Sequence, residues 1–147
     1  RRQRQMCIRD RYDIEHEYIE IELTESAFYD DKDVLLNTIR KLHEYGFVVS
    51  MDDFGSGYSS LNLLKNIPLD IIKLDGEFFN EADDKERGET VVRNTIVLAK
   101  DLNMKIVAEG IETKEQVEFL EEQGCDLIQG FYFARPMPVA DFEKLIS

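Results

Sequence analysis

The amino-acid sequence predicts an α/β fold in which parallel strands alternate with helices. Short runs rich in β-branched and large apolar residues recur along the chain, and a stretch with helical periodicity separates each run from the next. Two runs, Phe47–Met51 and Ile106–Ala108, are almost entirely apolar, which is typical of strands covered on both faces. Strands separated by helices pair in parallel through right-handed crossovers, so we expect one parallel sheet.

The elements follow one another in a regular order. The expected strands are 19–23, 47–51, 69–74, 104–108 and 126–128, and the expected helices are 33–45, 60–65, a segment from about 90 to 103, 113–124 and a last helix that begins at Pro138. Gly46 suits the C-terminal cap of the first helix, and Asn103 can end a later one in the left-handed conformation. Thr113 and Gln116 have the spacing of a capping box. Three apolar residues of the last helix are expected to face inward: Val139, Phe142 and Leu145.

Polar residues at the strand ends distinguish the two architectures that give this pattern, a doubly wound sheet and a (β/α)8 barrel. A doubly wound sheet usually has a glycine-rich phosphate loop after its first strand, and none is visible. Instead, the five expected strands end in or contain polar side chains: Glu22, Asp52 with Asp53, Lys73, Glu109 and Gln129. In a barrel the C-terminal strand ends converge on one face, where active sites lie. The sequence therefore predicts an α/β, partial (β/α)8 barrel of the TIM type.

These side chains have the chemistry of a divalent-metal site. Four carboxylates on one face would repel one another unless cations neutralise them, and oxygen ligands suit Mg²⁺, Mn²⁺ or Ca²⁺ rather than zinc. The adjacent Asp52 and Asp53 could let one carboxylate bridge two ions about 4 Å apart, as in two-metal phosphoryl transfer.

Each residue taken singly also has a structural explanation. Glu22 could lie on an exposed strand face, Asp52, Asp53 or Glu109 could belong to a turn, and Gln129 could be a polar core residue. Lys73 is the least easily explained in this way, because it lies between apolar neighbours and lysine is rarely buried without an acidic partner. The equivalent placement of all of them favours a site.

Composition and charge exclude several classes of function. The formal net charge of −13 argues against binding a nucleic-acid polymer or an anionic membrane through a basic surface. No apolar run approaches the roughly 20 residues needed to cross a bilayer. Cys7 and Cys125 have no zinc or redox spacing, so we interpret them as free thiols in a reducing cytoplasm.

The first twelve residues differ from the rest of the chain. They hold five arginines and one aspartate and show no strand or helix periodicity. A basic arm for anionic partners is one explanation. We favour a non-native, scar-like segment over 1–12 and expect the domain to occupy 13–147.

Five segments, in chain order, resemble the motifs of one known family: Glu22–Ser26, Asp52–Leu61, Ile72–Asp75, Ala108–Thr113 and Gln129–Phe131. Together they resemble the EAL-domain family of bacterial cyclic-di-GMP phosphodiesterases, over nearly all of Tyr18–Ser147. The resemblance implies a variant (β/α)8 barrel that hydrolyses cyclic di-GMP to linear pGpG by water attack, with two Mg²⁺ or Mn²⁺ ions.

The resemblance also implies roles at the metal centre. Glu22, Asp52 and Asp53 would be direct metal ligands, with Asp52 bridging the two ions. Glu109 would complete the metal and water shell as a catalytic residue. Lys73 would lie by the attacking water and steer or stabilise it.

Further roles concern the substrate and the dimer. Gln129 would help hold the water or the second metal's shell and, with Phe131 and Arg135, would meet the substrate. Glu25 would brace the loop Phe54–Ser60, which in this family couples the metal site to a dimer contact. A homodimer through the loop and helix after Asp53 is therefore expected in the full domain.

The sequence departs from the family pattern in two ways. Phe131 and Ser56 replace the usual Tyr and Thr, which are mild changes. The Glu-Ala-Leu signature, and a metal-binding Asn on the strand after it, are not in this sequence. We therefore expect about five C-terminal β/α units of an EAL barrel, and we expect this chain alone to be inactive because two metal ligands are missing.

Two other functions stay open at this point. One is a catalytically degenerate cyclic-di-GMP receptor, and the other is an unrelated metal-dependent barrel enzyme acting on another phosphate ester. For an EAL phosphodiesterase or receptor we expect a cytoplasmic bacterial protein, with sensory or GGDEF-type domains upstream. The parent could be tethered to a membrane through upstream segments.

Overall fold

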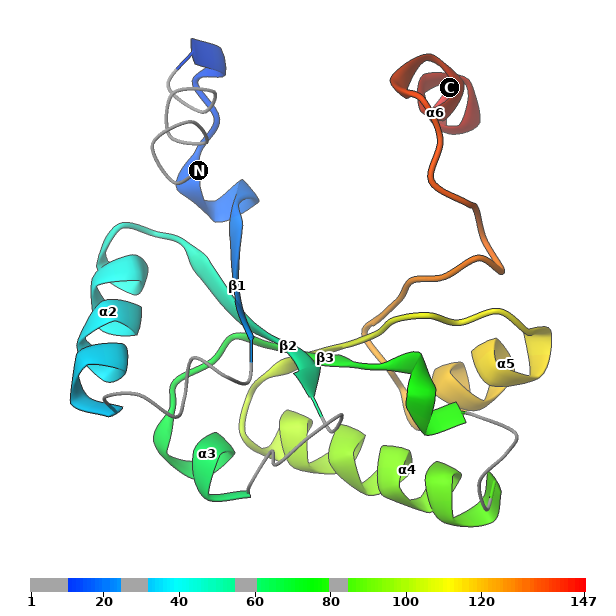
Figure 1. The fold of residues 1–147 in the computed structure, drawn as a ribbon, viewed down its shortest axis with the longest axis horizontal. Helices are drawn as coiled ribbons and strands as arrows, with labels where there is room; N and C mark the ends of the chain where they lie inside the picture. Colours follow the sequence, from blue (N-terminus) through cyan, green and yellow to red (C-terminus); the bar gives the residue numbers. More distant parts are fainter. Residues whose placement is uncertain (1–10, 25–31, 55–60, 80–84) are drawn as a thin grey trace.

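The computed structural model describes residues 11–24, 32–54, 61–79 and 85–147, and within these ranges strands and helices alternate (Figure 1). The strands are β1 (Glu20–Thr24), β2 (Val48–Phe54), β3 (Ile71–Leu74), β4 (Lys105–Ala108) and β5 (Leu127–Ile128). The α-helices are α2 (Lys32–Glu44), α3 (Leu61–Asn66), α4 (Lys85–Asp101), α5 (Lys114–Gln123) and α6 (Val139–Ile146), and the 3-10 turns are η1 (His16–Tyr18) and η3 (Gly76–Phe79).

The five strands form one parallel sheet in the order β1-β2-β3-β4-β5, so each strand pairs with the next one along the chain. This confirms the expected α/β fold with parallel strands. The register aligns Glu22 with Ser50 and Lys73 with Val107. Residues that are paired in parallel strands point to the same face of the sheet, so the register decides which side chains meet.

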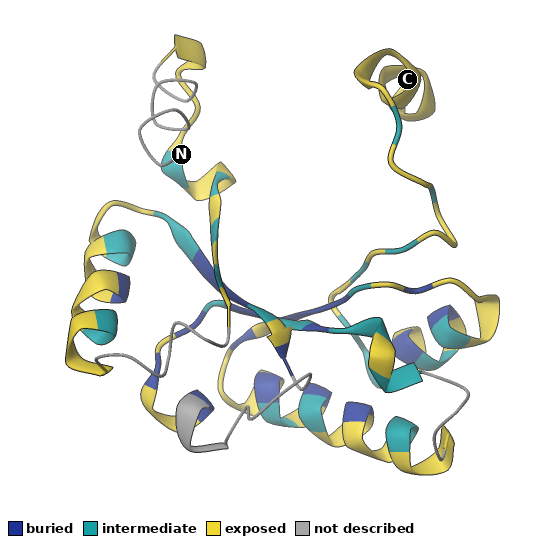
Figure 2. Ribbon diagram, in the orientation of Figure 1, coloured by how far each residue is buried: buried dark blue, intermediate teal, exposed yellow. Residues whose placement is uncertain are grey.

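The hydrophobic core lies between the sheet and the helices on one of its faces (Figure 2). Its strand residues include Met51, Ile72 and Ile106, and its helix residues include Ile39 of α2 and Ile96 of α4, all of them fully buried. Helix α2 is amphipathic because apolar residues recur every three or four positions. Burial of these side chains holds the strands in register.

The other face of the sheet bears Glu22, Ser50 and Lys73, which alternate with apolar residues along β1, β2 and β3. Figure 1 shows the helices α2 to α5 on one side of the sheet, while the two ends of the chain rise on the opposite side. In the two runs that were expected to be covered on both faces, consecutive residues are buried, over Val49–Met51 and Ile106–Ala108. On the polar face the exposure varies, from the fully buried Ser50 to the half-exposed side chain of Glu22.

Several helix ends have the local structure that the sequence predicts. Gly46 and Asn103 adopt positive φ angles of 83° and 58° after α2 and α4. Thr113 and Gln116 form a complete capping box at the start of α5. No helix within the described ranges combines the length and apolar character needed to cross a membrane.

Two kinds of expectation about the elements are wrong. First, two elements are longer than expected: α4 begins at Lys85 rather than near residue 90, and β2 continues past Met51 to Phe54, so Asp52 and Asp53 lie in the strand rather than in the loop after it. The pairing of β2 with β3 shifts between Met51 and Phe54, which accommodates this extension.

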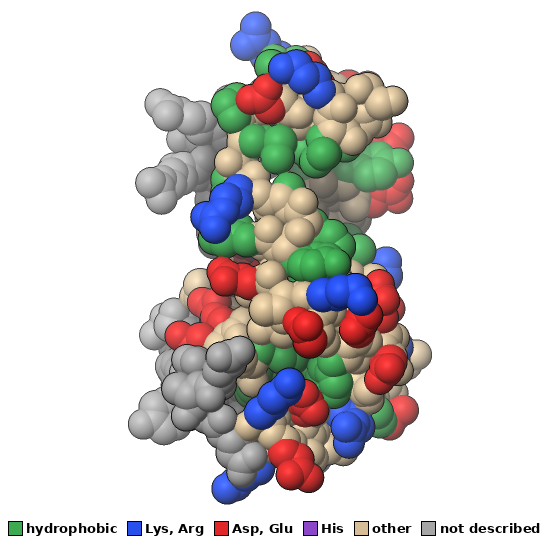
Figure 3. All heavy atoms as spheres, turned by 90° about the vertical axis from the view of Figure 1, so that its right-hand side faces the viewer, with side chains coloured by type: hydrophobic (Ala, Val, Ile, Leu, Met, Phe, Trp, Pro, Cys, Tyr) green, Lys and Arg blue, Asp and Glu red, His purple; other side chains and the backbone are tan. Residues whose placement is uncertain are grey.

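The second error concerns α6, whose apolar residues were expected to face inward. Val139, Phe142 and Leu145 are 72%, 49% and 62% exposed. The segment between β5 and α6 carries the helix away from the sheet, and Figure 3 shows hydrophobic side chains on the surface of this part of the molecule. Amphipathic periodicity indicates which face of a helix is apolar, but not what covers that face.

Candidate active site

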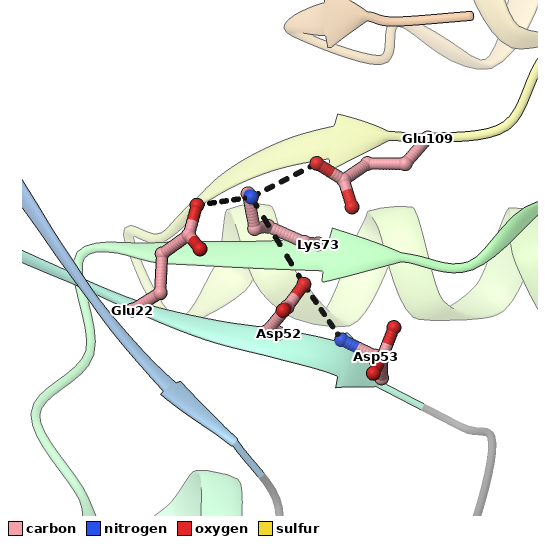
Figure 4. Close-up of polar contacts among 5 residues, drawn as sticks. All are labelled: Glu22, Asp52, Asp53, Lys73 and Glu109. Carbon is pink, nitrogen blue, oxygen red and sulfur yellow. Dashed lines mark hydrogen bonds and ion pairs between the residues drawn. The ribbon is translucent and has the colours of Figure 1, made fainter.

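Lys73 lies at the centre of the polar face, where three carboxylates approach its ammonium group (Figure 4). Its Nζ is 2.5 Å from Glu22 Oε1, 2.9 Å from Glu109 Oε1 and 4.0 Å from Asp52 Oδ1. These residues come from β1, β3, β2 and the end of β4, which are the positions that the sequence predicts to converge.

The surroundings of Lys73 explain how a charged lysine is kept there. Its side chain is only 12% exposed, whereas that of Glu22 is 50% exposed. Burial alone would lower the pKa of Lys73, but its hydrogen bonds with Glu22 and Glu109 raise it above its usual value. Lys73 is therefore protonated, and its positive charge offsets part of the negative charge of the carboxylates.

Asp52 and Asp53 end β2 in an irregular backbone conformation. Asp53 has a φ of 53°, and its backbone N–H donates to Asp52 Oδ1 at 3.1 Å. Burial, followed by the negative charges of Asp52, Asp75 and Glu109, raises the pKa of Asp53. Burial contributes most to this shift, and the neighbouring carboxylates add negative charge that a cation would stabilise.

Asp75 is a residue of this centre to which the sequence assigns no role. It follows β3 directly, hydrogen-bonds the Asp53 side chain, and accepts from the Glu77 backbone N–H at 2.7 Å through Oδ1. A carboxylate one residue beyond a strand end is the same signal that identified Glu109, so it could have been found by the same reasoning.

Glycines allow the loops after β3 and β4 to approach closely beside Glu109. A Cβ on Gly76 would lie 2.9 Å from the Glu109 carbonyl oxygen and 3.0 Å from that of Gly110. Side chains at this point would push the loop of Glu109 away from β3. The backbone contact therefore helps to position the Glu109 carboxylate.

Gln129, Phe131 and Arg135 lie beyond the end of β5. The Gln129 backbone N–H donates to the Ala108 carbonyl at 2.8 Å, which extends the pairing of β4 and β5 by one residue. Arg135 stacks its guanidinium on the Phe131 ring, with Cζ 4.5 Å from the ring centroid, and both side chains are exposed. Among the contacts of Lys73 with described residues, none involves these three side chains. Glu25 and the loop residues 55–60 lie outside the described residues.

The carboxylates suit a hard divalent cation in the chemistry of their donor atoms. Every acidic side chain that approaches Lys73 offers only oxygen, as Mg²⁺ and Mn²⁺ require. In the part of the chain that the structure describes, no three acidic, histidine or cysteine side chains are grouped closely enough to hold a metal ion. The carboxylates are instead arranged around the Lys73 ammonium, so they already bind one cation.

Chemically, the arrangement can bind cations and, through them, a phosphate ester. Carboxylates without a cation would repel a phosphodiester, whereas cations held by the same groups would attract it and would lower the pKa of a bound water. The Lys73 ammonium can donate hydrogen bonds to a water or an anionic oxygen in the same place.

Comparison with known proteins identifies the family of this chain. The EAL domain model matches residues 3–136. Cyclic di-GMP phosphodiesterase NbdA of Pseudomonas aeruginosa is 40% identical over 129 residues, which are 88% of this chain and 16% of that protein.

Two solved structures match the fold closely. The PaMucR phosphodiesterase in its c-di-GMP complex superposes with a TM-score of 0.83 at 39% identity, covering 93% of this chain and 56% of that one. Klebsiella pneumoniae BlrP1 in a manganese and cyclic-di-GMP complex superposes with a TM-score of 0.81 at 32% identity, covering 90% of this chain and 34% of that one. The chain thus spans about half or less of these relatives. With five parallel strands in common with these structures and a family match over most of its length, this chain belongs to the EAL domain family.

Proposed function

We propose that this chain is part of a phosphodiesterase domain that hydrolyses cyclic di-GMP to linear pGpG with two Mg²⁺ or Mn²⁺ ions. The convergence of Glu22, Asp52 and Glu109 on the Lys73 ammonium is the observation that carries the proposal. The names of NbdA and PaMucR, which describe phosphodiesterases of this dinucleotide, support the choice of substrate.

The carboxylates are the residues that would hold the metal ions. Glu22, Asp52 and Asp53 would be direct ligands, and Glu109 would complete the shell. The ions, when bound, would supply an activated water and would screen the charge of the phosphodiester. The manganese and cyclic-di-GMP complex of BlrP1 supports this cofactor assignment.

The other polar residues would bind and orient. Lys73 would donate hydrogen bonds to the attacking water, and the exposed Gln129 would help to hold it. The stacked Phe131 and Arg135 offer an aromatic face beside a positive charge, which suits a guanine base or a phosphate of the substrate. Asp75 would be a positioning residue, because it hydrogen-bonds Asp53.

We also propose that the 147 residues alone are inactive or nearly so. The sequence contains no Glu-Ala-Leu tripeptide, and the chain covers 56% of the PaMucR structure that it matches. A catalytic centre that lacks two of its metal ligands would bind the ions weakly and place them poorly. The proposed boundary after residue 12, the homodimer and the upstream sensory or GGDEF-type domains remain predictions.

A direct assay tests the activity. The purified chain is incubated with Mn²⁺ and cyclic di-GMP, and the nucleotides are separated by chromatography. We expect no pGpG above background from this chain. In a complete domain that contains this sequence, Asp52→Asn should abolish turnover, whereas Asp101→Asn, the same change on the exposed end of α4, should leave it intact. Full activity of the Asp52→Asn domain would refute the metal-ligand role.

The second candidate is a receptor that binds cyclic di-GMP without hydrolysing it. The observation in its favour is the Phe131–Arg135 stack, which presents a binding surface that does not depend on metal ions. Binding of cyclic di-GMP by a complete domain, measured by calorimetry, together with no pGpG formation in Mn²⁺, would select the receptor.

A further inference from the structure

We propose that Lys73 is an internal cation that occupies the carboxylate centre before metal binds, and that a divalent cation must displace its ammonium from Glu22. This inference rests on the metal ligands of the proposed function and adds a regulation of the same site. Lys73 would thereby set the affinity of the chain for metal, in addition to its role beside the water.

The first argument is geometric. Lys73 Nζ is 2.5 Å from Glu22 Oε1 and 2.9 Å from Glu109 Oε1, so the ammonium joins a carboxylate of β1 to the carboxylate that follows β4 (Figure 4). A divalent ion bound to the same Glu22 oxygen would lie about 2.1 Å from it, which places two positive charges within a few ångströms. The two cations would repel each other strongly in a site that is only partly hydrated.

The second argument is the charge balance of the described centre. Glu22, Asp52, Asp53 and Glu109 supply four carboxylates, and Lys73 is the cation that contacts this group in the structure. The lysine thus stabilises the centre when metal is absent, because it neutralises part of a charge that would otherwise repel itself.

The third argument concerns a place for the displaced ammonium. Ser50 is fully buried, and its Oγ has no hydrogen-bond partner among the residues that the structure describes. It pairs with Glu22 in the register of β1 and β2 and precedes Asp52 by two residues, so it lies on the same face of the sheet. A hydroxyl that still needs a partner can accept a hydrogen bond from the lysine once Glu22 is taken by metal.

Metal affinity tests the proposal on the whole chain. Mn²⁺ binding is followed by the electron paramagnetic resonance signal of free Mn²⁺ for the parent chain, Lys73→Met and Lys105→Met. Lys105 is the matched control because it is exposed at the opposite end of the neighbouring strand, so both variants lose one positive charge. We expect Lys73→Met to bind Mn²⁺ roughly tenfold more tightly than the parent chain, and Lys105→Met to bind like the parent. Equal or weaker binding by Lys73→Met would overturn the proposal.

A second measurement uses the unmodified chain, in case Lys73→Met does not fold. Lysines are acylated briefly with and without Mn²⁺, and the modified peptides are quantified by mass spectrometry. Release from Glu22 should increase the labelling of Lys73 several-fold, with Lys105 unchanged in the same molecules. Mn²⁺ binding without increased labelling of Lys73 would refute displacement of the Lys73 ammonium and would not affect the metal-ligand assignment. Absence of Mn²⁺ binding in all three chains would overturn the displacement, whereas the metal-ligand assignment is decided separately by Asp52→Asn in the complete domain.

Discussion

Gly130 links the end of β5 to the segment that bears Phe131 and Arg135, and alanine at this position tests how the two are held. A Cβ on Gly130 would lie 1.9 Å from the carbonyl oxygen of Ile111 and 2.3 Å from its nitrogen. Ordinary contact begins at 3.4 Å, so the shortest of these distances falls short by 1.5 Å. The obstacle is backbone, which cannot rotate aside as a flexible side chain would.

The expected loss of stability follows from the bonds that must move. Ile111 donates its N–H to the Gln129 carbonyl at 3.1 Å and accepts from the Tyr132 N–H at 3.0 Å. Separation of the two segments would weaken both hydrogen bonds, at roughly 1 kcal/mol each, and crowding adds roughly 1 to 3 kcal/mol. Gly130→Ala should therefore lower the free energy of unfolding by about 3 to 5 kcal/mol, a large part of the total for a typical domain.

Urea unfolding followed by circular dichroism measures this change. Gly88→Ala is the comparison, because its Cβ would meet a single close backbone atom, the Phe78 carbonyl oxygen at 2.7 Å. Crowding against this backbone atom costs roughly 1 to 3 kcal/mol, and alanine inside α4 gains about 1 kcal/mol of helix propensity, so we expect a net loss of roughly 0 to 2 kcal/mol. If Gly130→Ala unfolds within about 0.5 kcal/mol of the parent chain, the close packing of Gly130 against Ile111 does not matter to stability.

Three further predictions concern the rest of the molecule. Thr113→Ala removes the capping box of α5 and should cost about 1 kcal/mol in urea unfolding, and no measurable loss would contradict the role of the cap. Leu120→Ala should lower the free energy of unfolding by roughly 2 to 5 kcal/mol, because Leu120 is fully buried. Leu145→Ala on the exposed helix α6 should lower it by less than about 0.5 kcal/mol. Equal effects of the two substitutions would show that α6 is packed in solution. Burial raises the pKa of the Cys125 thiol above its ordinary value of 9.0. The fold therefore favours the neutral thiol. Its contribution to stability is complete below pH 9.0 and is lost as the pH rises through the raised pKa. In a Cys7→Ser chain, alkylation of Cys125 should be slow until the chain is unfolded.

The sequence predicts the sheet, and it predicts that Glu22, Asp52, Lys73 and Glu109 lie close together, because both depend on local patterns. Alternation of helical and strand periods requires parallel pairing, and parallel pairing brings all strand ends to one edge. Lys73 shows most clearly how a local pattern predicts a contact. Its place between two apolar residues indicates burial, and burial of a lysine requires the acidic partners that the structure supplies in Glu22 and Glu109.

Other features could not be predicted, because they depend on contacts between distant parts of the chain. The extension of β2 through Asp53 needs a register shift against β3, which has no signature in β2 alone. The exposure of α6 depends on which surfaces are available to cover it, and its periodicity does not contain that information.

The sequential order of the strands has a consequence for how the molecule forms. Because every described strand pairs with the next one along the chain, each β/α unit can pair with the strand that was synthesised just before it. Lys73 reaches its partners in stages: Glu22 and Asp52 precede it, and Glu109 follows it on the next strand. The cluster of carboxylates around Lys73 is therefore completed only when β4 joins the sheet and brings Glu109, and the net charge of the cluster changes as the chain emerges. Until Lys73 is synthesised, Glu22 and Asp52 have no lysine from β3 to neutralise them. The pairing of β3 with β2 therefore extends the sheet and brings the lysine to these carboxylates in one step.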